Sequence, residues 1–323
     1  MLENILLLIA GLVVLIFGGE LLVRGASRLA LQLKISPLVV GLTIVAFGTS
    51  APELFISLKS AMAGSPDIAI GNVVGSNICN LTLILGLTAI ITPMPVGRNS
   101  IRIDWPVAMG ATILLYFWMY DGYIELFEGV IFIILLILYT AFIIKKSRNE
   151  TNEAIEAIDE ELGIDVDPKI SSENTKRTVI DILLVITGCV GLYFGSDWFV
   201  KGAIELAAFL GVSERVIGLT VVAVGTSLPE MVTSIMASIR KQIDVALGNL
   251  IGSNIFNILS ILGITSIIQD IEVSEMILST DMIWMMAVTF VILPMMVSKK
   301  NIQRFEGVVL FLVYCVYTYS VLI

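Results

Sequence analysis

The feature that most constrains this chain is a helix-breaking hexad that occurs twice inside apolar segments. Residues 48–53 read Gly-Thr-Ser-Ala-Pro-Glu, and residues 225–230 read Gly-Thr-Ser-Leu-Pro-Glu. Each hexad lies in an apolar run long enough to cross a bilayer, which takes about 20 residues. The proline removes a backbone donor and crowds the carbonyl four residues earlier. Because a carboxylate inside a membrane span is costly, each glutamate indicates a functional site.

Composition assigns the chain to the integral membrane proteins. Apolar residues make up 57% of its 323 residues, whereas soluble domains average about 45–50%. The sequence has no histidine, which excludes histidine-based metal sites and proton relays. Cys79, Cys189 and Cys315 lie in apolar runs without metal-ligand spacing, so we interpret them as packing residues and expect no cofactor. Residues 1–4 lack the basic start of a signal peptide, so we expect the first span to be retained.

The apolar segments predict ten membrane spans. They are Ile5–Val23, Pro37–Met62, Ile68–Ile91, Trp105–Tyr120, Phe127–Ile144, Val179–Val200, Val216–Ile239, Val245–Ile268, Met276–Val297 and Phe305–Leu322. The polar stretch 145–178 separates a first group of five spans, in residues 1–144, from a second group, in residues 179–323.

The two groups of five are copies of one another. Glu53 and Glu230 lie 177 positions apart, and the same offset relates Gly86 to Gly263 and Asp67 to Asp244. The two copies align without a gap from Phe17 to Ile91. A period this long is far beyond that of a solenoid repeat, so the pattern indicates a duplication.

The basic residues predict how the copies cross the membrane, because cytoplasmic loops are enriched in lysine and arginine. With the N-terminus outside, all but Lys59, Lys201 and Arg215 of the 19 basic residues fall on the inner side. Both termini are then outside the cell membrane and the central loop is cytoplasmic. Because each copy has an odd number of spans, the second copy crosses the membrane in the opposite direction to the first. We therefore predict an all-α multi-pass membrane protein with ten transmembrane helices in two inverted five-helix repeats, broken at the midplane.

The central polar stretch carries much of the net charge of −9. Ile155, Ile158 and Leu162 have helical spacing, which predicts one short amphipathic helix in a cytoplasmic linker. Asp165 and Asp167 are followed by a proline and a lysine, so the stretch has no EF-hand loop. We assign no partner to it and expect no nucleic-acid binding.

The first hexad offers only oxygen ligands. The break at Pro52 frees the Gly48 carbonyl, beside the Thr49 and Ser50 hydroxyls and the Glu53 carboxylate. Oxygen ligands suit hard cations such as Ca²⁺ and Na⁺, and the absence of soft or nitrogen ligands argues against zinc, copper or iron.

A polar stripe follows each hexad at the start of the next span. Asn72, Ser76 and Asn80 recur every four residues and share one helix face, and Asn249, Ser253 and Asn257 repeat the pattern. Four oxygen-bearing segments are therefore expected to meet in one pocket. The structural alternative is that single Ser, Thr or Asn residues only brace neighbouring helices. Asn77 and Asn254 lie off the stripe and fit that bracing role better.

The charges of the two glutamates suggest a mechanism. Two carboxylates at the midplane carry a charge of about −2, which one Ca²⁺ or two Na⁺ would neutralise. An empty dianionic pocket is costly to hold in a medium of low dielectric constant. The protein should then change conformation only when loaded with one ion type or the other, which is exchange.

The doubled motif Gly-Thr-Ser-x-Pro-Glu followed by Gly-Asn-x-x-Gly-Ser-Asn-x-x-Asn resembles the two repeats of the cation/calcium antiporter superfamily, and most closely the prokaryotic sodium/calcium exchangers. The resemblance implies that Na⁺ entry drives Ca²⁺ extrusion through alternating access. It also implies that the first helix of each half is long, tilted and exposed to lipid. The implied ion ligands are Ala46 and Ala223 by their carbonyls, with Thr49, Ser50, Glu53, Ser76, Asn80, Thr226, Ser227, Glu230, Ser253 and Asn257.

The chain departs from the family at one point. Members of the family can carry an aspartate at one of the positions matched by Asn80 and Asn257, whereas this chain has asparagine at both. The pocket then holds two ionisable carboxylates instead of three, which leaves the ion stoichiometry open.

Three alternatives to sodium/calcium exchange remain open at this point. A Ca²⁺/H⁺ antiporter would use the same two glutamates, although the doubled Thr-Ser pairs favour sodium. An intramembrane hydrolase using Ser50 or Ser227 lacks a histidine base and a nucleophile elbow, so we expect no enzyme activity. A passive calcium channel would show no dependence on a counter-ion. The expected partners are Ca²⁺, Na⁺ and the lipid bilayer, with H⁺ as the partner in the Ca²⁺/H⁺ alternative, and we expect the monomer to function.

Overall fold

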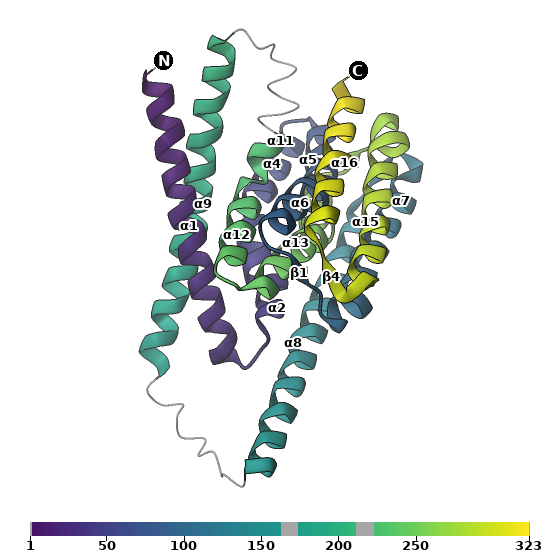
Figure 1. Cartoon of the computed structure of the whole chain (residues 1–323). Coiled ribbons are helices and arrows are strands. Elements are labelled where there is room, and N and C mark those ends of the chain that lie inside the picture. The colour runs from purple at the N-terminus through teal and green to yellow at the C-terminus, as the bar shows by residue number, and fades with distance from the viewer. Residues whose placement is uncertain (1, 163–173, 211–222, 323) are drawn as a thin grey trace.

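The computed structural model is built almost entirely of helices and describes residues 2–162, 174–210 and 223–322 (Figure 1). The first half contains α1 (Leu2–Leu33), α2 (Pro37–Val40), α3 (Ala46–Thr49), α4 (Ala51–Met62), α5 (Pro66–Cys79), α6 (Leu85–Ile91), α7 (Trp105–Trp118) and α8 (Leu126–Leu162). The second half contains α9 (Asn174–Phe209), α11 (Ala223–Thr226), α12 (Leu228–Ile239), α13 (Ile243–Phe256), α14 (Gly263–Ile268), α15 (Met282–Val297) and α16 (Arg304–Leu322).

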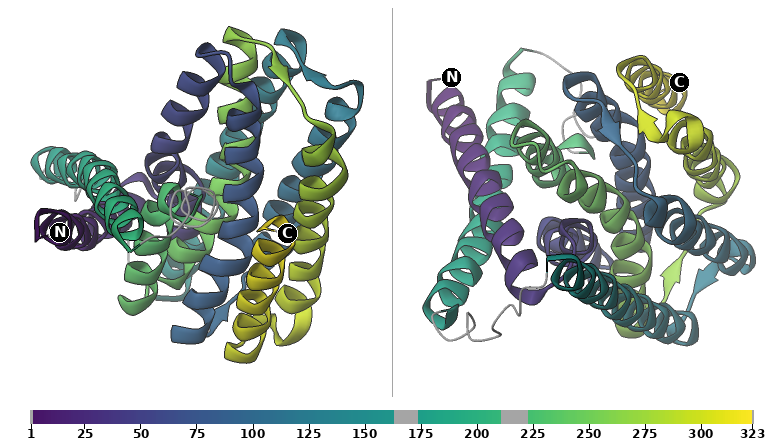
Figure 2. Two further views of the ribbon diagram at one scale, coloured as in Figure 1. Left: turned by 90° about the horizontal axis from the view of Figure 1, so that it is seen from above. Right: turned by 60° about the horizontal axis from the view of Figure 1, so that its bottom comes forward.

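Helices α1 and α9 form a pair that stands to one side of the remaining helices (Figures 1 and 2). Glycines let the two backbones approach closely. A Cβ on Gly18 would lie 2.8 Å from the Leu192 amide nitrogen, and one on Gly188 would lie 2.6 Å from that of Leu22. Small residues at such contacts are typical of helix pairs in membranes. Only 28% of the apolar window of each helix is buried, so most of each surface faces outward, as expected for lipid-exposed helices.

Both hexads interrupt a helix at the serine. A π-helical turn, Gly41–Val45, joins α2 to α3, and α4 follows after a bend of 44° at Ser50. Ser50 has φ −84° and ψ 4°, and Ser227, between α11 and α12, has φ −89° and ψ 9°. The prolines fall at the second position of α4 and α12, where a missing backbone N–H costs little.

The centre of the bundle is formed by the segments that follow each broken helix. Of the apolar window in residues 68–91, 78% is buried, and in residues 243–268 the buried share is 83%. Each segment continues through a π-helical turn, Asn80–Ile84 or Asn257–Leu262, into α6 or α14. The polar stripes predicted from the sequence therefore lie in the most buried part of the molecule.

Four short strands pair between the two halves. Strand β1 (Met94–Pro95) is antiparallel to β4 (Asn301–Ile302), and β2 (Tyr123–Ile124) is antiparallel to β3 (Ile271–Glu272). In each pair one strand comes from the first half and the other from the second. The reciprocal pairing fits two copies of one unit that face each other.

The part of the chain that the structure describes has seven helices long and apolar enough to cross a membrane, or eight if the bent pair Pro37–Thr49 and Ala51–Met62 is one span. This confirms an all-α integral membrane protein. The number ten stays a prediction, because α12 is a shorter apolar helix and residues 211–222 lie outside the described ranges.

The residues for which a short helix was predicted in the central linker, 155–162, are helical, but they do not form a helix of their own. Helix α8 continues past the end of the apolar run at Ile144 to Leu162, so the amphipathic spacing belongs to the extension of a membrane helix. Residues 163–173, which include Asp165 and Asp167, lie outside the described ranges.

Candidate cation site

The two glutamates occupy equivalent positions at the starts of two helices. Glu53 is the third residue of α4 and Glu230 the third residue of α12. A helix N-terminus carries partial positive charge and favours a carboxylate in its first turn. Both residues are fully buried, so the breaks at Ser50 and Ser227 place two acidic side chains deep inside the apolar bundle.

A hydrogen bond joins the two halves at these glutamates. The Ser50 hydroxyl donates to Glu230 Oε1 over 3.0 Å. Ser50 belongs to the first hexad, three residues before Glu53, and Glu230 belongs to the second hexad. The structure therefore brings the two carboxyl groups into one region, as the sequence predicted.

Thr49 adds a second set of contacts between the halves. Its hydroxyl lies 3.1 Å from Asn249 Oδ1 and 3.5 Å from Ser253 Oγ, both on α13. It also lies 3.3 Å from the Ala46 carbonyl oxygen, which already accepts the Ser50 amide. Thr49, Ser253 and the Ala46 carbonyl thus form a cluster of oxygen atoms in a fully buried region.

Two asparagines hold the first turns of α4 and α12 in place. Asn249 Nδ2 donates to the Glu230 carbonyl over 3.4 Å and to Ser234 Oγ over 3.0 Å. Asn72 Nδ2 makes the matching contacts with the Glu53 carbonyl and Ser57 Oγ. The sequence placed both asparagines on the polar stripes, but it missed Ser57 and Ser234. Their shared offset of four residues from each glutamate was the available signal.

Asn77 and Asn254 brace the two halves against each other, the role that the sequence favoured for them. Each side-chain amide donates to the other residue's carbonyl over 3.2 Å. Asn257 Nδ2 donates to Asn77 Oδ1 over 3.1 Å. Because the Asn77 amide nitrogen is committed to Asn254, only its oxygen can face Asn257. Asn257 must therefore donate, which leaves its own Oδ1 directed elsewhere.

Several buried polar atoms of the two hexads and the two polar stripes have no protein partner. In native proteins most buried polar groups are hydrogen-bonded, so a set of orphans on these segments calls for a ligand. Among the residues that the structure describes, the orphaned atoms of the hexads and stripes are both carboxylate oxygens of Glu53, Glu230 Oε2, Ser76 Oγ, Ser227 Oγ, Asn257 Oδ1, and the Oδ1 and Nδ2 of Asn80. All but one of these atoms are oxygens, the ligand type that Ca²⁺ and Na⁺ require.

The counterparts of Thr49 and Ala46 in the second half are Thr226 and Ala223. Thr226 is half-buried and lines a cavity of about 270 Å³ between α4 and α9, together with Pro52, Phe55 and Asp197. Ala223 is the first residue of α11, and its side chain lies outside the described set. Over the described ranges, no group of three or more His, Cys, Asp and Glu side chains could hold a metal ion, so any cation here must use hydroxyl, amide and carbonyl oxygens as well.

The sequence matches the family described as sodium/calcium exchanger protein over residues 3–145 and 180–323. It is 35% identical over 322 residues to the putative antiporter CaxA of Alkalimonas amylolytica, covering 99% of this chain and 98% of that protein. It is 33% identical to the sodium/calcium exchanger MaX1 of Methanosarcina acetivorans, with 96% of each chain covered.

The fold is similar to that of a solved exchanger. The sodium-calcium exchanger NCX_Mj, soaked with zero Na⁺ and Ca²⁺, superposes with a TM-score of 0.83 at 30% sequence identity, and the match covers 99% of each chain.

Proposed function

This chain belongs to the sodium/calcium exchanger protein family, and from that premise we propose that it moves Ca²⁺ out of the cell by antiport against Na⁺, through alternating access. The observation that carries the proposal is the meeting of the two hexads. Ser50 of the first half bonds Glu230 of the second, while three of the four carboxylate oxygens of Glu53 and Glu230 have no protein partner. An ion held there would be bound by both halves at once.

We propose that Glu53 and Glu230 bind the Ca²⁺ directly. The remaining ligands of the Ca²⁺ and Na⁺ sites would be Thr49, Ser50, Ser76, Asn80, Thr226, Ser227, Ser253 and Asn257, with the carbonyls of Ala46 and Ala223. One Ca²⁺ or two Na⁺ would balance the charge of about −2. The empty, ionised pocket would be too costly to carry through an occluded state, which couples the two ion flows.

The two sides of the site support an alternating-access mechanism. The cavity beside Thr226 approaches the site from the α4–α9 side, whereas α1 and α12 are tied together by Arg240, whose Nε donates to Glu20 over 2.9 Å. In the ten-span arrangement of two inverted repeats, with both termini outside, the first side faces outward and the second faces the cytoplasm. The structure then corresponds to an outward-facing state.

Calcium/proton antiport is the second candidate, because two protons could neutralise Glu53 and Glu230 as well as two Na⁺ could. The hydroxyls of Thr49 and Ser50 favour sodium, because a proton on a carboxylate needs no such ligands. The asparagines at 80 and 257 leave no third carboxyl to carry a proton.

We assign no catalytic residue and propose that the monomer functions, since one chain supplies both glutamates.

Transport by reconstituted protein tests the proposal. Vesicles preloaded with Na⁺ should take up radiolabelled Ca²⁺ when diluted into Na⁺-free buffer, and uptake should disappear without the Na⁺ gradient. A pH gradient of equal size should drive little uptake. If the pH gradient alone drives uptake, the protein is a Ca²⁺/H⁺ antiporter, and if neither gradient matters the transport is passive.

A further inference from the structure

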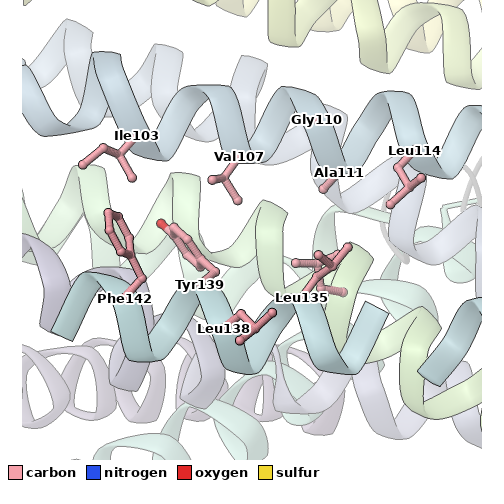
Figure 3. A pocket seen from close by; sticks show the side chains of 10 residues that line it. Ile103, Val107, Gly110, Ala111, Leu114, Leu135, Leu138, Tyr139 and Phe142 are labelled. Atoms are coloured by element: carbon pink, nitrogen blue, oxygen red, sulfur yellow. The ribbon is translucent and has the colours of Figure 1, made fainter. Parts of the chain in front are cut away.

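An apolar groove of about 390 Å³ lies between α7 and α8, away from the cation site (Figure 3). Val107 and Leu114 of α7, with Ile103 of the π-helical turn Ser100–Asp104 that precedes it, face α8 across the groove (Figure 3). Leu135 and Phe142 line the α8 side. Both helices belong to apolar segments, and the groove is open on one side. It therefore faces the hydrocarbon of the bilayer.

The corresponding position in the second half carries a larger side chain. Trp284, 177 positions after Val107, packs edge-on against Tyr317 at a ring distance of 5.8 Å. Tyr317 bonds Asp281, as Tyr139 bonds Asp104 in the first half. The first half therefore has a valine at the position where the second half has an indole. Gly110 widens the opening, since a Cβ there would meet nothing within 4 Å.

The groove has the dimensions of one acyl chain. Ile103 and Leu114 are separated by about 16 Å along the helix at 1.5 Å per residue. That length is about half of the 30 Å hydrocarbon core, or one leaflet. Water would find too few polar partners there, and an empty groove would lose dispersion contacts. An alkyl chain is the occupant that the surroundings supply.

Two basic residues stand at one end of the groove. Ile103 and Phe142 mark that end in Figure 3; Arg102 directly precedes Ile103, and Lys145 follows Phe142 by one helical turn. Both basic side chains are exposed, and neither pairs with a carboxylate among the described residues, whereas the neighbouring Lys146 pairs with Glu150 at 3.4 Å. The end of the groove therefore carries two cationic side chains that have no carboxylate partner among the described residues.

We propose that this groove is a binding site for an anionic phospholipid, with one acyl chain between α7 and α8 and the headgroup phosphate at Arg102 and Lys145. Basic residues at a membrane surface attract anionic headgroups. The ten-span topology puts this end at the cytoplasmic leaflet. The site is separate from the cation site and does not depend on the proposed exchange.

Native mass spectrometry tests the proposal on the full-length protein. After incubation with equal amounts of phosphatidylglycerol and phosphatidylcholine of the same chain length, the wild type should retain one phosphatidylglycerol in preference to phosphatidylcholine. In the double variant Arg102→Gln/Lys145→Gln, the preference for phosphatidylglycerol over phosphatidylcholine should fall by about tenfold. Lys299→Gln/Lys300→Gln is the matched control, because it removes two exposed charges from another loop and should keep the preference.

Filling the groove tests the position of the acyl chain. Val107→Trp copies the residue found in the second half and should abolish retention of both lipids. If that variant fails to fold, Gly110→Leu places a side chain in the same open space. Retention of the lipid by a folded, groove-filled variant would overturn the proposal. Equal binding of the two lipids by the wild type would overturn the headgroup assignment, and so would displacement by inorganic phosphate alone.

Discussion

The two interfaces that flank the cation site are equivalent in sequence but differ in structure. On one side α1 packs against α12, where Glu20 pairs with Arg24 on its own helix and with Arg240 at the end of α12. On the other side α9 carries Asp197 and Lys201 at the positions of Glu20 and Arg24, and these pair with each other at 2.7 Å. Helix α4, however, is followed directly by Ala63, the counterpart of Arg240, and Ala63 carries no charge. Among the described residues, an ion pair therefore links the two helices only on the α1–α12 side.

Packing at the two interfaces differs in the same direction. On the tied side, Gly19 lets α1 approach α12, so that a Cβ there would lie 3.0 Å from Val232 Cγ1. On the other side, the cavity of about 270 Å³ separates Phe55 of α4 from Tyr193 of α9. One sequence unit thus forms a closed interface in one copy and an open one in the other. A transporter that alternates between two faces needs this pair of arrangements to be interchangeable.

Removing the carboxyl group of Glu53 or of Glu230 should have the largest effect on Ca²⁺ uptake. The loss of uptake should be the same for both residues. Glu53→Gln or Glu230→Gln should lower Na⁺-driven Ca²⁺ uptake by at least about 100-fold, because the site loses one of the two charges that bind Ca²⁺. The exposed Glu125→Gln is the control. Wild-type uptake by one of the two site variants would mean that the halves do not share the ion.

An aspartate at position 257 should make exchange depend on pH. Asn257 must donate to Asn77 Oδ1, and an aspartate can do so only when protonated. In Asn257→Asp, uptake should be about tenfold below wild type at high pH and should approach wild type as the pH falls. The same change at Asn80, whose side-chain atoms have no protein partner, should lack this recovery. Loss of uptake at low pH in Asn257→Asp would contradict the donor assignment.

The supporting asparagine Asn249 should have a smaller effect than the carboxylates. It holds both Glu230 and Thr49, which belong to different halves. Asn249→Ala should reduce the apparent Ca²⁺ affinity of uptake by about tenfold. An unchanged Ca²⁺ dependence of uptake in this variant would show that these two contacts do not support the site.

The ion pairs at the two interfaces should give the smallest effect. Arg240→Gln removes the tie between α1 and α12 and should favour opening on that side by about threefold, the scale of a partly exposed ion pair. Ala63→Arg places a matching charge on α4, opposite Asp197, and should favour closing of the cavity. The rate at which a membrane-impermeant maleimide labels Phe55→Cys reports both shifts. The labelling should become slower when Ala63→Arg is added, and also when Arg240→Gln is added. Unchanged rates in both would show that these charges do not set the balance.

The sequence predicted the site through residues whose chemistry is unusual for their surroundings. A carboxylate and a proline in an apolar run identify Glu53 and Glu230 without any tertiary information. The polar stripes predicted that Asn249 and Ser253 share one helix face, since helical periodicity alone decides this. The contacts of both residues with Thr49 come from the structure.

The features that the sequence missed depend on contacts between distant segments. The donor role of Asn257 follows from the commitment of Asn77 to Asn254 across the two halves, which no local pattern encodes. The repeat predicts identical halves, so it could not reveal that only the α1–α12 side is closed. The extension of α8 to Leu162 was missed because the apolar pattern ends at Ile144 while the backbone remains helical.

The central claim is that one Ca²⁺ is held jointly by Glu53 and Glu230, one from each half. Crystals soaked in Ca²⁺ and measured for anomalous scattering test it most directly. The account predicts a single strong peak between the two carboxylates, which disappears when the crystal is transferred to high Na⁺. Separate peaks at the two glutamates, or a peak that Na⁺ does not displace, would contradict it.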